Sequence, residues 1–394
     1  PYTPSVMDTA NIQTWADIGV IFLLFALGLE FSFKKIVKVG GAAIIAACTI
    51  IFCMILLGIT VGTGFGWQRM DSIFLGGMIA MSSTTIIYKA FDDLGMRKKQ
   101  FTGLVLSVLI LEDILAIVLM VMLSTMAVRH NFEGSEMLES IGKLLFFLIL
   151  WFVVGIYLIP ELLKRCRKLM SEETLLIVSL GLCFGMVVMA ARTGFSAAFG
   201  AFIMGSILAE TVEAESIERL VKPVKDLFGA VFFVSVGMMV DPAMIVEYAL
   251  PIIVITLAVI FGQSLFGTLG VLLAGQPLKT AMQCGFSLTQ IGEFAFIIAS
   301  LGVSLHVTSD FLYPIVVAVS VITTFLTPYM IRFAEPASNF VDTHLPVKWK
   351  NFLLHYSSGS QTMNHESLWK KLILALTRIT IVYSLSLIHI SEPT

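Results

Sequence analysis

The sequence has little charge, and this scarcity excludes most soluble folds. Only 13% of its 394 residues are Asp, Glu, Lys or Arg, against about 25% in an average soluble domain. Hydrophobic residues make up 57% of the chain and its mean hydropathy is +0.93. A soluble fold of this length would lack the polar residues needed to cover its surface. The composition therefore predicts that lipid is the solvent for most of the chain.

The sequence also lacks the patterns of metal, redox and nucleotide chemistry. Its five cysteines include no C-x-x-C pair, and its six histidines fall in expected loops and in the tail. A G-x-G-x-G at residues 62–66 follows an apolar helix rather than a strand. No basic cluster interleaved with aromatic residues is present to bind nucleic acid. We therefore expect no cofactor and no nucleic-acid partner.

Long apolar runs recur along the chain and predict an all-α polytopic membrane protein. A helix needs about 20 apolar residues to cross the hydrocarbon core of a bilayer, and reading for such runs gives eleven segments. A further run at 368–390 carries Lys370, Lys371 and Arg378, which also suit a helix on the membrane surface. The eleven segments are residues 14–32, 41–63, 72–91, 101–127, 141–163, 173–192, 195–210, 226–240, 249–274, 280–303 and 310–334.

Basic residues gather in alternate loops between these segments. If every segment crosses the membrane, fifteen Lys and Arg residues lie on one side and only Arg69, Arg129, Lys143 and Arg192 on the other. Positive residues favour the cytoplasm, so the basic loops and the C-terminal tail are expected there, at the inner membrane. The fifteen are Lys34, Lys35, Lys38, Arg97, Lys98, Lys99, Lys164, Arg165, Arg167, Lys168, Arg219, Lys222, Lys225, Lys279 and Arg332.

Two of the segments are too polar for ordinary spans. Residues 82–85 read Ser-Ser-Thr-Thr, and residues 287–293 contain Ser287, Thr289, Gln290, Gly292 and Glu293. Such runs at membrane depth indicate helices that unwind where they line a cavity, and paired interrupted helices point to a transporter's binding site. We expect breaks near 83–85 and near 289–292. The alternative is a helix interface rich in small residues.

An acidic pair near mid-bilayer carries the chemistry. Glu112 and Asp113 lie in GLVLSVLILEDILAIVLMVMLS, about eleven residues into an apolar run. Each costs about 2.5–3.5 kcal/mol on insertion scales, which favours a function, although a pair that caps a broken helix is the alternative. A buried carboxylate that holds either a proton or a cation is the minimal device for exchanging them. Glu293 suits a structural or a functional role equally, whereas Asp17 and Glu30 lie near helix ends and read as interfacial.

Six sequence blocks occur in the order found in a known family. They are ADIGVIFLLFALGLEFS, MSSTTIIYKAFDDLG, LILEDILAIV, TGFSAAFGAFIMGSILAET, VFFVSVGMMVD and SLTQIGEFAFIIA. On these blocks the chain resembles the monovalent cation:proton antiporter-2 family, in particular its Kef-type members, over residues 15–334.

The resemblance implies an inverted-repeat cation/proton antiporter fold with two discontinuous crossing helices, in a homodimer whose core domain moves against a dimer scaffold. It implies that the first two helices of that fold are missing from this sequence. Residues 1–334 would form the exchanger's transmembrane domain. Residues 335–394 would form a cytoplasmic linker and the start of a further apolar or amphipathic segment, cut short.

The resemblance also implies the site residues. Asp113 falls at the family's ion- and proton-binding aspartate, so a monovalent cation is expected there, and Glu112 falls where relatives carry Asp, Asn or Gln. Thr84 and Thr85 fall in the first crossover. The supporting residues are Ser83, Gln263, Gln290 and Glu293.

Two features depart from the family pattern. Many members carry a basic residue opposite the acidic pair, where this sequence has Gln263. An empty site without that base should keep a proton on Glu112, or share one across the pair. Many Kef-type members also append a nucleotide-binding regulatory domain, which does not occur within these 394 residues.

The leading interpretation is a secondary antiporter, and not an enzyme, that exchanges H+ for Na+ or K+ by alternating access. The first alternative is a Kef-type ligand-gated potassium efflux system. The second is a non-transporting receptor or scaffold, which gains nothing from buried carboxylates. A third is an organic-anion symporter on a similar fold, which needs no acidic pair. The sequence does not choose between Na+ and K+.

Overall fold

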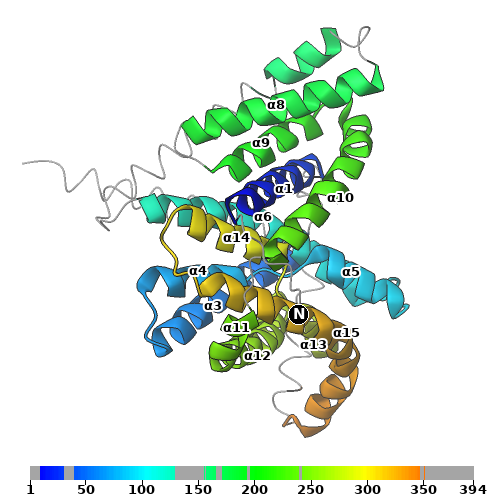
Figure 1. Ribbon diagram of the computed structural model, residues 1–394. Helices are drawn as coiled ribbons and strands as arrows, with labels where there is room; N and C mark the ends of the chain where they lie inside the picture. The colour runs from blue at the N-terminus through cyan, green and yellow to red at the C-terminus, as the bar shows by residue number, and fades with distance from the viewer. Residues whose placement is uncertain are drawn as a thin grey trace, which may run out of the picture.

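The computed structural model describes residues 9–30, 40–128, 155, 157–165, 171–192, 196–238, 242–346 and 350. All regular structure within these ranges is helical (Figure 1). Six of the described segments are long and apolar enough to cross a membrane. The expected run at 368–390, and most of that at 141–163, fall outside the described residues.

Helices occupy the predicted apolar runs that fall within these ranges, and two of those runs are split. The helices are α1 (Thr9–Glu30), α3 (Gly41–Gly64), α4 (Arg69–Ile79), α5 (Thr84–Asp93), α6 (Gln100–Val128), α8 (Glu172–Arg192), α9 (Ala197–Ala209), α10 (Ala214–Met238), α11 (Pro242–Glu247), α12 (Ala249–Leu273), α13 (Leu278–Ser287), α14 (Glu293–Ser304) and α15 (Leu312–His344).

The helices pack in two groups. In one, α1 packs against α9 and α10, and α8 packs against α9. In the other, α3, α4, α12, α13 and α15 pack together, and α6 and α14 lie between this group and α1 (Figure 1). Small residues let these helices approach closely, as is usual in membranes. A Cβ on Gly28 of α1, for instance, would collide with the carbonyl of Phe202 on α9.

The pattern of helix packing in the second group is repeated, as expected for a fold built from repeats. Helix α3 packs against α4 and α6, and in the same way α12 packs against α13 and α15. Each set thus has a long helix, a broken helix and a second long helix. The predicted fold class, an all-helical chain with two discontinuous helices, is confirmed.

The two breaks lie against each other and exchange hydrogen bonds. The first comprises residues 80–83, between α4 and α5, and the second residues 288–292, between α13 and α14. Gly292 N donates to Met81 O at 2.8 Å, and Ser82 Oγ donates to Leu288 O at 3.1 Å. Backbone groups released by one break are therefore satisfied by the other, which unwound backbone at membrane depth requires.

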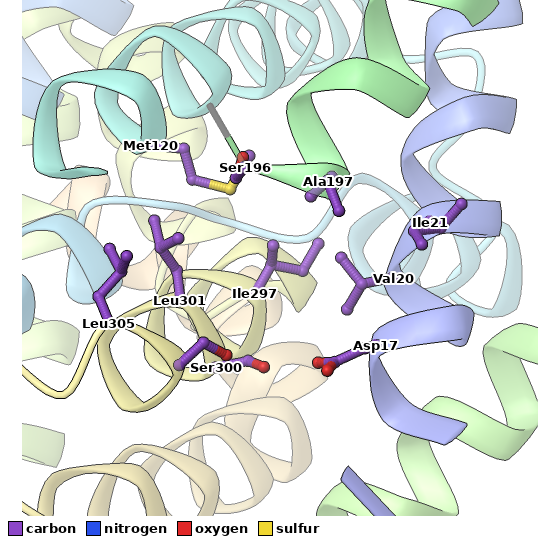
Figure 2. Close-up of a pocket in the computed structure, with 12 residues that line it drawn as sticks. Asp17, Val20, Ile21, Met120, Ser196, Ala197, Ile297, Ser300, Leu301 and Leu305 are labelled. Atoms are coloured by element: carbon purple, nitrogen blue, oxygen red, sulfur yellow. The ribbon is translucent and has the colours of Figure 1, made fainter. Parts of the chain in front are cut away.

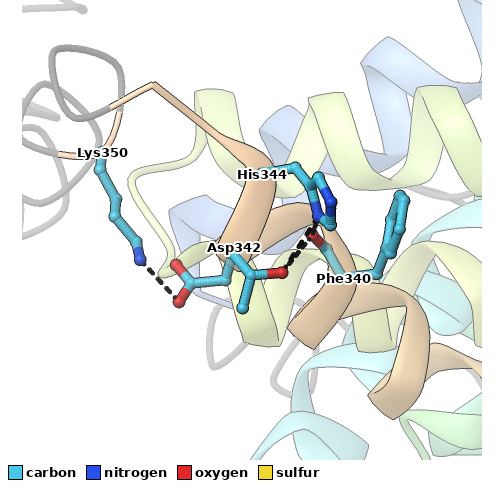
Figure 3. A network of polar contacts seen from close by, with 5 residues as sticks. Phe340, Asp342, His344 and Lys350 are labelled. Carbon is cyan, nitrogen blue, oxygen red and sulfur yellow. Dashed lines mark hydrogen bonds and ion pairs between the residues drawn. The ribbon is translucent and has the colours of Figure 1, made fainter.

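Helix α15 continues beyond its apolar part. It runs unbroken to His344, so it passes through the boundary expected at residue 334. At its end, Lys350 Nζ pairs with Asp342 Oδ2 at 2.9 Å, and His344 Nδ1 lies 2.9 Å from Phe340 O (Figure 3). Residues 351–394 lie outside the described part of the chain.

Candidate ion-binding site

The acidic pair of α6 faces the first break. Glu112 is 1% exposed and Asp113 is half-buried. Ser82 N donates to Glu112 Oε2 at 3.1 Å, and Thr84 Oγ1 donates to Asp113 Oδ2 at 3.1 Å. Adjacent residues on a helix point about 100° apart. This is why Glu112 meets the unwound strand while Asp113 meets the first residue of α5.

Glu293 joins the two breaks through the N-cap of α5. Ser83 Oγ accepts from Ile86 N and thereby caps α5, and it donates to Glu293 Oε2 at 2.8 Å. Glu293 is itself the first residue of α14. Its carboxylate therefore lies beside two helix N-termini, whose partial positive charges favour an anion.

Side chains of α15 hold the second break in its unwound form. Ile291 N donates to Thr323 Oγ1 at 3.3 Å, and Ser320 Oγ donates to Ile291 O at 3.0 Å. Gln290 Nε2 donates to Ser83 O at 3.1 Å, and Gln290 Oε1 accepts from Thr324 Oγ1 at 3.3 Å. Gln290 is thus a tie between the breaks, with both ends of its amide engaged.

Gln263 caps a helix end. It is fully buried on α12, and its Nε2 donates to Ile79 O, at the C-terminus of α4, at 3.2 Å. Its Oε1 and Glu112 Oε1 are both buried without a hydrogen-bond partner among the described residues. Lys89 is exposed on α5. No basic side chain of the described ranges forms an ion pair with Glu112 or Asp113.

Most of the predicted site residues come together, and Thr85 does not. The residues that meet at the crossing of the two breaks are Asp113, Glu112, Thr84, Ser83, Gln290 and Glu293. Gln263 lies beside them, at the end of α4 that leads into the first break. Thr85 is exposed on α5 and forms no side-chain hydrogen bond in the described part of the chain. The helix resumes at Thr84, so the next side chain turns away from α6.

Sequence reasoning missed the contribution of α15. Ser320, Thr323 and Thr324 were not predicted to take part, although a Thr-Thr pair in an apolar run is the same signal that marked residues 82–85. Ser82 was recognised only as part of that run, and it is the residue that contacts both Glu112 and the second break.

The electrostatics of the site are dominated by acids. Asp113 lies within electrostatic reach of Glu293, Glu112 and Glu30, and Glu30 is itself paired with Lys225 at 3.0 Å. Carboxylates close together in an apolar setting cannot all remain charged without a counter-ion. The arrangement therefore suits groups that take up protons or cations.

Comparison with known proteins also points to a family of ion exchangers. The family described as "Sodium/hydrogen exchanger, transmembrane" matches residues 3–334, and the resemblance inferred from the sequence blocks is confirmed. YbaL of Escherichia coli is 31% identical over 347 residues, which cover 85% of this chain and 62% of YbaL. The K(+)/H(+) antiporter subunit KhtU of Bacillus subtilis is 30% identical over 76% of this chain and 74% of its own.

A solved structure shares the fold. The sodium proton antiporter MjNhaP1 from Methanocaldococcus jannaschii at pH 8 superimposes with a TM-score of 0.61 at 15% identity. The match covers 86% of this chain and 88% of that one. The likeness at this identity concerns the fold alone. The chain spans less than two thirds of the length of YbaL.

Proposed function

The chain belongs to the sodium/hydrogen exchanger family, and on that premise we propose that it is a secondary antiporter exchanging protons for Na+ or K+. The observation that carries the proposal is the acidic pair of α6, held by hydrogen bonds against the crossing of two broken helices. A receptor or scaffold would gain nothing from buried carboxylates that cost about 2.5–3.5 kcal/mol each on insertion scales.

Asp113 is the shared site in this mechanism. A protonated Asp113 cannot also ligate a cation, and a cation at Asp113 displaces the proton, so the two fluxes are coupled without ATP. The Thr84 hydroxyl, 3.1 Å from Asp113 Oδ2, is a further oxygen for the cation. Access alternates when the group containing α4, α13 and α15 moves against the group containing α1.

Glu112 keeps its proton through the cycle. One of its oxygens accepts a single backbone hydrogen bond and the other is buried without a partner in the described part of the chain. A buried carboxylate with no counter-charge is strongly disfavoured, and Gln263, bound to Ile79 O, supplies none. One proton then moves per monovalent cation, and exchange is electroneutral.

Orientation and assembly complete the proposal. The face with the basic loops, such as residues 97–99 and Lys279, lies in the cytoplasm, and the protein works as a homodimer in the inner membrane. A Kef-type efflux system is the alternative, which would require a regulatory domain outside these 394 residues.

The first experiment measures exchange by the purified protein in liposomes that trap a pH-sensitive dye. Asp113→Asn keeps the side-chain volume but removes the titrating charge, and it should abolish proton movement driven by Na+ or K+ gradients. Asp93→Asn, at the exposed end of α5, is the matched control and should retain parental rates. Normal exchange by Asp113→Asn would refute the site.

A second experiment tests the stoichiometry. Exchange driven by a Na+ gradient is measured with a membrane potential imposed by a gradient of the permeant anion thiocyanate, because a K+ gradient could itself drive the transporter. The rate should be independent of voltage if Glu112 never releases its proton. A rate that changes steeply with voltage would show net charge movement and would contradict the role given to Glu112.

A further inference from the structure

A cavity of about 280 Å³ lies between α1, α6, α9 and α14 (Figure 2). Among the described residues that line it, Asp17 is the charged one, and Ser196, Ser300 and Ser304 add hydroxyl groups. Figure 2 shows the Asp17 carboxylate pointing from α1 toward Ser300 of α14. Since a water molecule occupies about 30 Å³ of liquid, the volume suits a monovalent cation with part of its hydration shell.

The cavity is stacked on the acidic pair along two helices. Met120, which lines it, lies seven residues after Asp113 on α6, two turns or about 10 Å further along nearly the same face. On α14, Ile297 and Ser300 follow Glu293 by one and two turns. Both helices run away from the basic loops here, so the cavity lies beyond the site on the opposite side of the membrane.

The walls of the cavity come from both packing groups. Asp17 lies on α1, which packs against α9 and α10, whereas Ser300 lies on α14, which packs against α4, α6 and α15. Tyr313 of α15 is not one of the lining residues, but its side chain is within electrostatic reach of Asp17. Its hydroxyl is buried without a hydrogen-bond partner among the described residues.

We propose that Asp17 and this cavity form a recruitment site for hydrated monovalent cations, between Asp113 and the membrane face opposite the basic loops. The proposal rests on the proposed exchange function and adds a second, outer site to it. A carboxylate in a narrow cleft with low-dielectric walls focuses the field and raises the local concentration of cations. Its charge acts alike on Na+, K+ and H+, because it does not depend on tight coordination.

The first test is exchange measured from each side of oriented proteoliposomes. In Asp17→Asn, the apparent KM for Na+ or K+ offered at the face opposite the basic loops should rise about three- to tenfold. The apparent KM for protons at that face should rise by the same factor, as reversible exchange requires. The KM at the basic face and the maximal rate should not change, and Asp17→Glu should behave as the parent.

Asp310→Asn is the matched control for exchange. Asp310 is exposed in the loop between α14 and α15, at the same end of α14 as the cavity, and it should leave every KM unchanged. A high concentration of a salt that is not transported should also remove the difference between Asp17→Asn and the parent, because its mobile ions screen the charge of Asp17. An unchanged KM in Asp17→Asn, an equal change at both faces, or the same effect from Asp310→Asn would overturn the proposal.

A second test does not depend on exchange. Ser300→Cys is made in a chain whose five native cysteines are replaced, and it is reacted with cationic and anionic thiol reagents of matched size. The cationic reagent should react about three- to tenfold faster, and Asp17→Asn should bring the ratio close to one. An unreactive cysteine, or a ratio unaffected by Asp17→Asn, would refute the recruitment site even if Asp113→Asn abolishes exchange. Conversely, a charge preference at Ser300→Cys that depends on Asp17, together with normal exchange by Asp113→Asn, would support the recruitment site and refute the role of Asp113.

Discussion

The crossing of the two breaks leaves no room for a side chain at Gly292, and Gly292→Ala should damage both stability and transport. A Cβ at this position would lie 2.6 Å from the carbonyl carbon and oxygen of Ser82, and 2.8 Å from Ser83 N. These are backbone atoms, which cannot rotate away. Ordinary contact begins at 3.4 Å, so the two segments would have to separate by about 0.8 Å.

The size of the effect follows from that displacement. Overpacking of a close-packed interior typically costs about 1–3 kcal/mol, which should appear as a lower free energy of unfolding. A shift of this size in Ser82 is large compared with the tolerance of its 3.1 Å hydrogen bond from N to Glu112 Oε2, so the geometry of the acidic pair would also be disturbed. Because an error of about 1 Å in a site can cost 100-fold in rate, exchange should fall by about 10- to 100-fold.

Gly103→Ala is the matched control. Gly103 lies on the exposed face of α6, and a Cβ there would have no atom within 4 Å, so this change should be neutral or stabilise the helix by up to about 1 kcal/mol. Thermal unfolding in detergent and exchange in liposomes would be measured for both variants. A Gly292→Ala protein as stable and as active as the parent would show that the breaks are not in the close contact described.

Other predictions address the site and its support. Thr84→Val should raise the apparent KM for the cation at Asp113 by about tenfold, since a hydrogen bond to a charged group contributes about 1.5–3 kcal/mol. Thr85→Val should leave that KM unchanged, and equal effects would refute the different roles given to the two threonines. Lowering the pH by one unit on the side that offers the cation should raise the apparent KM for that cation by up to about tenfold at an unchanged maximal rate, because a proton occupies Asp113 and excludes the cation. A fall in maximal rate at constant KM would contradict that competition. Asp71→Asn should lower the free energy of unfolding by about 1–3 kcal/mol, since the buried Asp71 carboxylate accepts 2.7 Å hydrogen bonds from both the backbone N and the hydroxyl of Ser309. An unchanged melting temperature would show that these hydrogen bonds do not stabilise the fold.

The breaks and the acidic pair could be predicted from the sequence because each is costly in lipid. Ser82 and Ser83, Gln290, and the pair Glu112–Asp113 stand out from apolar runs, and the structure brings them together. Local polarity does not fix the exact residue, however. The unwound segment ends at Ser83, so the expected break at 83–85 is about two residues too late in the chain, and Thr85 belongs to the helix.

Long-range partners could not be read from the chain. Gln263 was expected opposite the acidic pair, and the partner of its amide is Ile79 O at the end of α4, a residue 184 positions away in the chain. Asp17 was interpreted as interfacial from its place near a helix end, whereas in the structure it lines the cavity between α1, α6, α9 and α14. Neither contact leaves a mark in local composition.

The search for apolar runs also predicted two helices that are shorter than those in the structure. Helix α10 begins at Ala214, twelve residues before the apolar run expected at 226–240. Its first turns were missed because they carry the charged residues Glu215, Arg219 and Lys222. Helix α15 passes residue 334 for the same reason, since its last turns are polar. A window that searches for apolar residues ends where a helix leaves the lipid, and the hydrogen-bonded helix continues into water.

The mutual hydrogen bonding of the two breaks has a consequence for biosynthesis. Ser82 and Leu288 are 206 residues apart in the chain, and Ser83 and Gln290 are 207 apart. While a ribosome is still making α6 to α12, the first break lacks the partners that the second break provides, and its backbone groups cannot rest unpaired in hydrocarbon. The growing chain must therefore hold residues 80–83 in a wet or helical form, and the ion site is created only when α13 and α14 insert. Ribosome-bound chains halted before residue 288 should accordingly lack the site, whatever the number of helices already in the membrane.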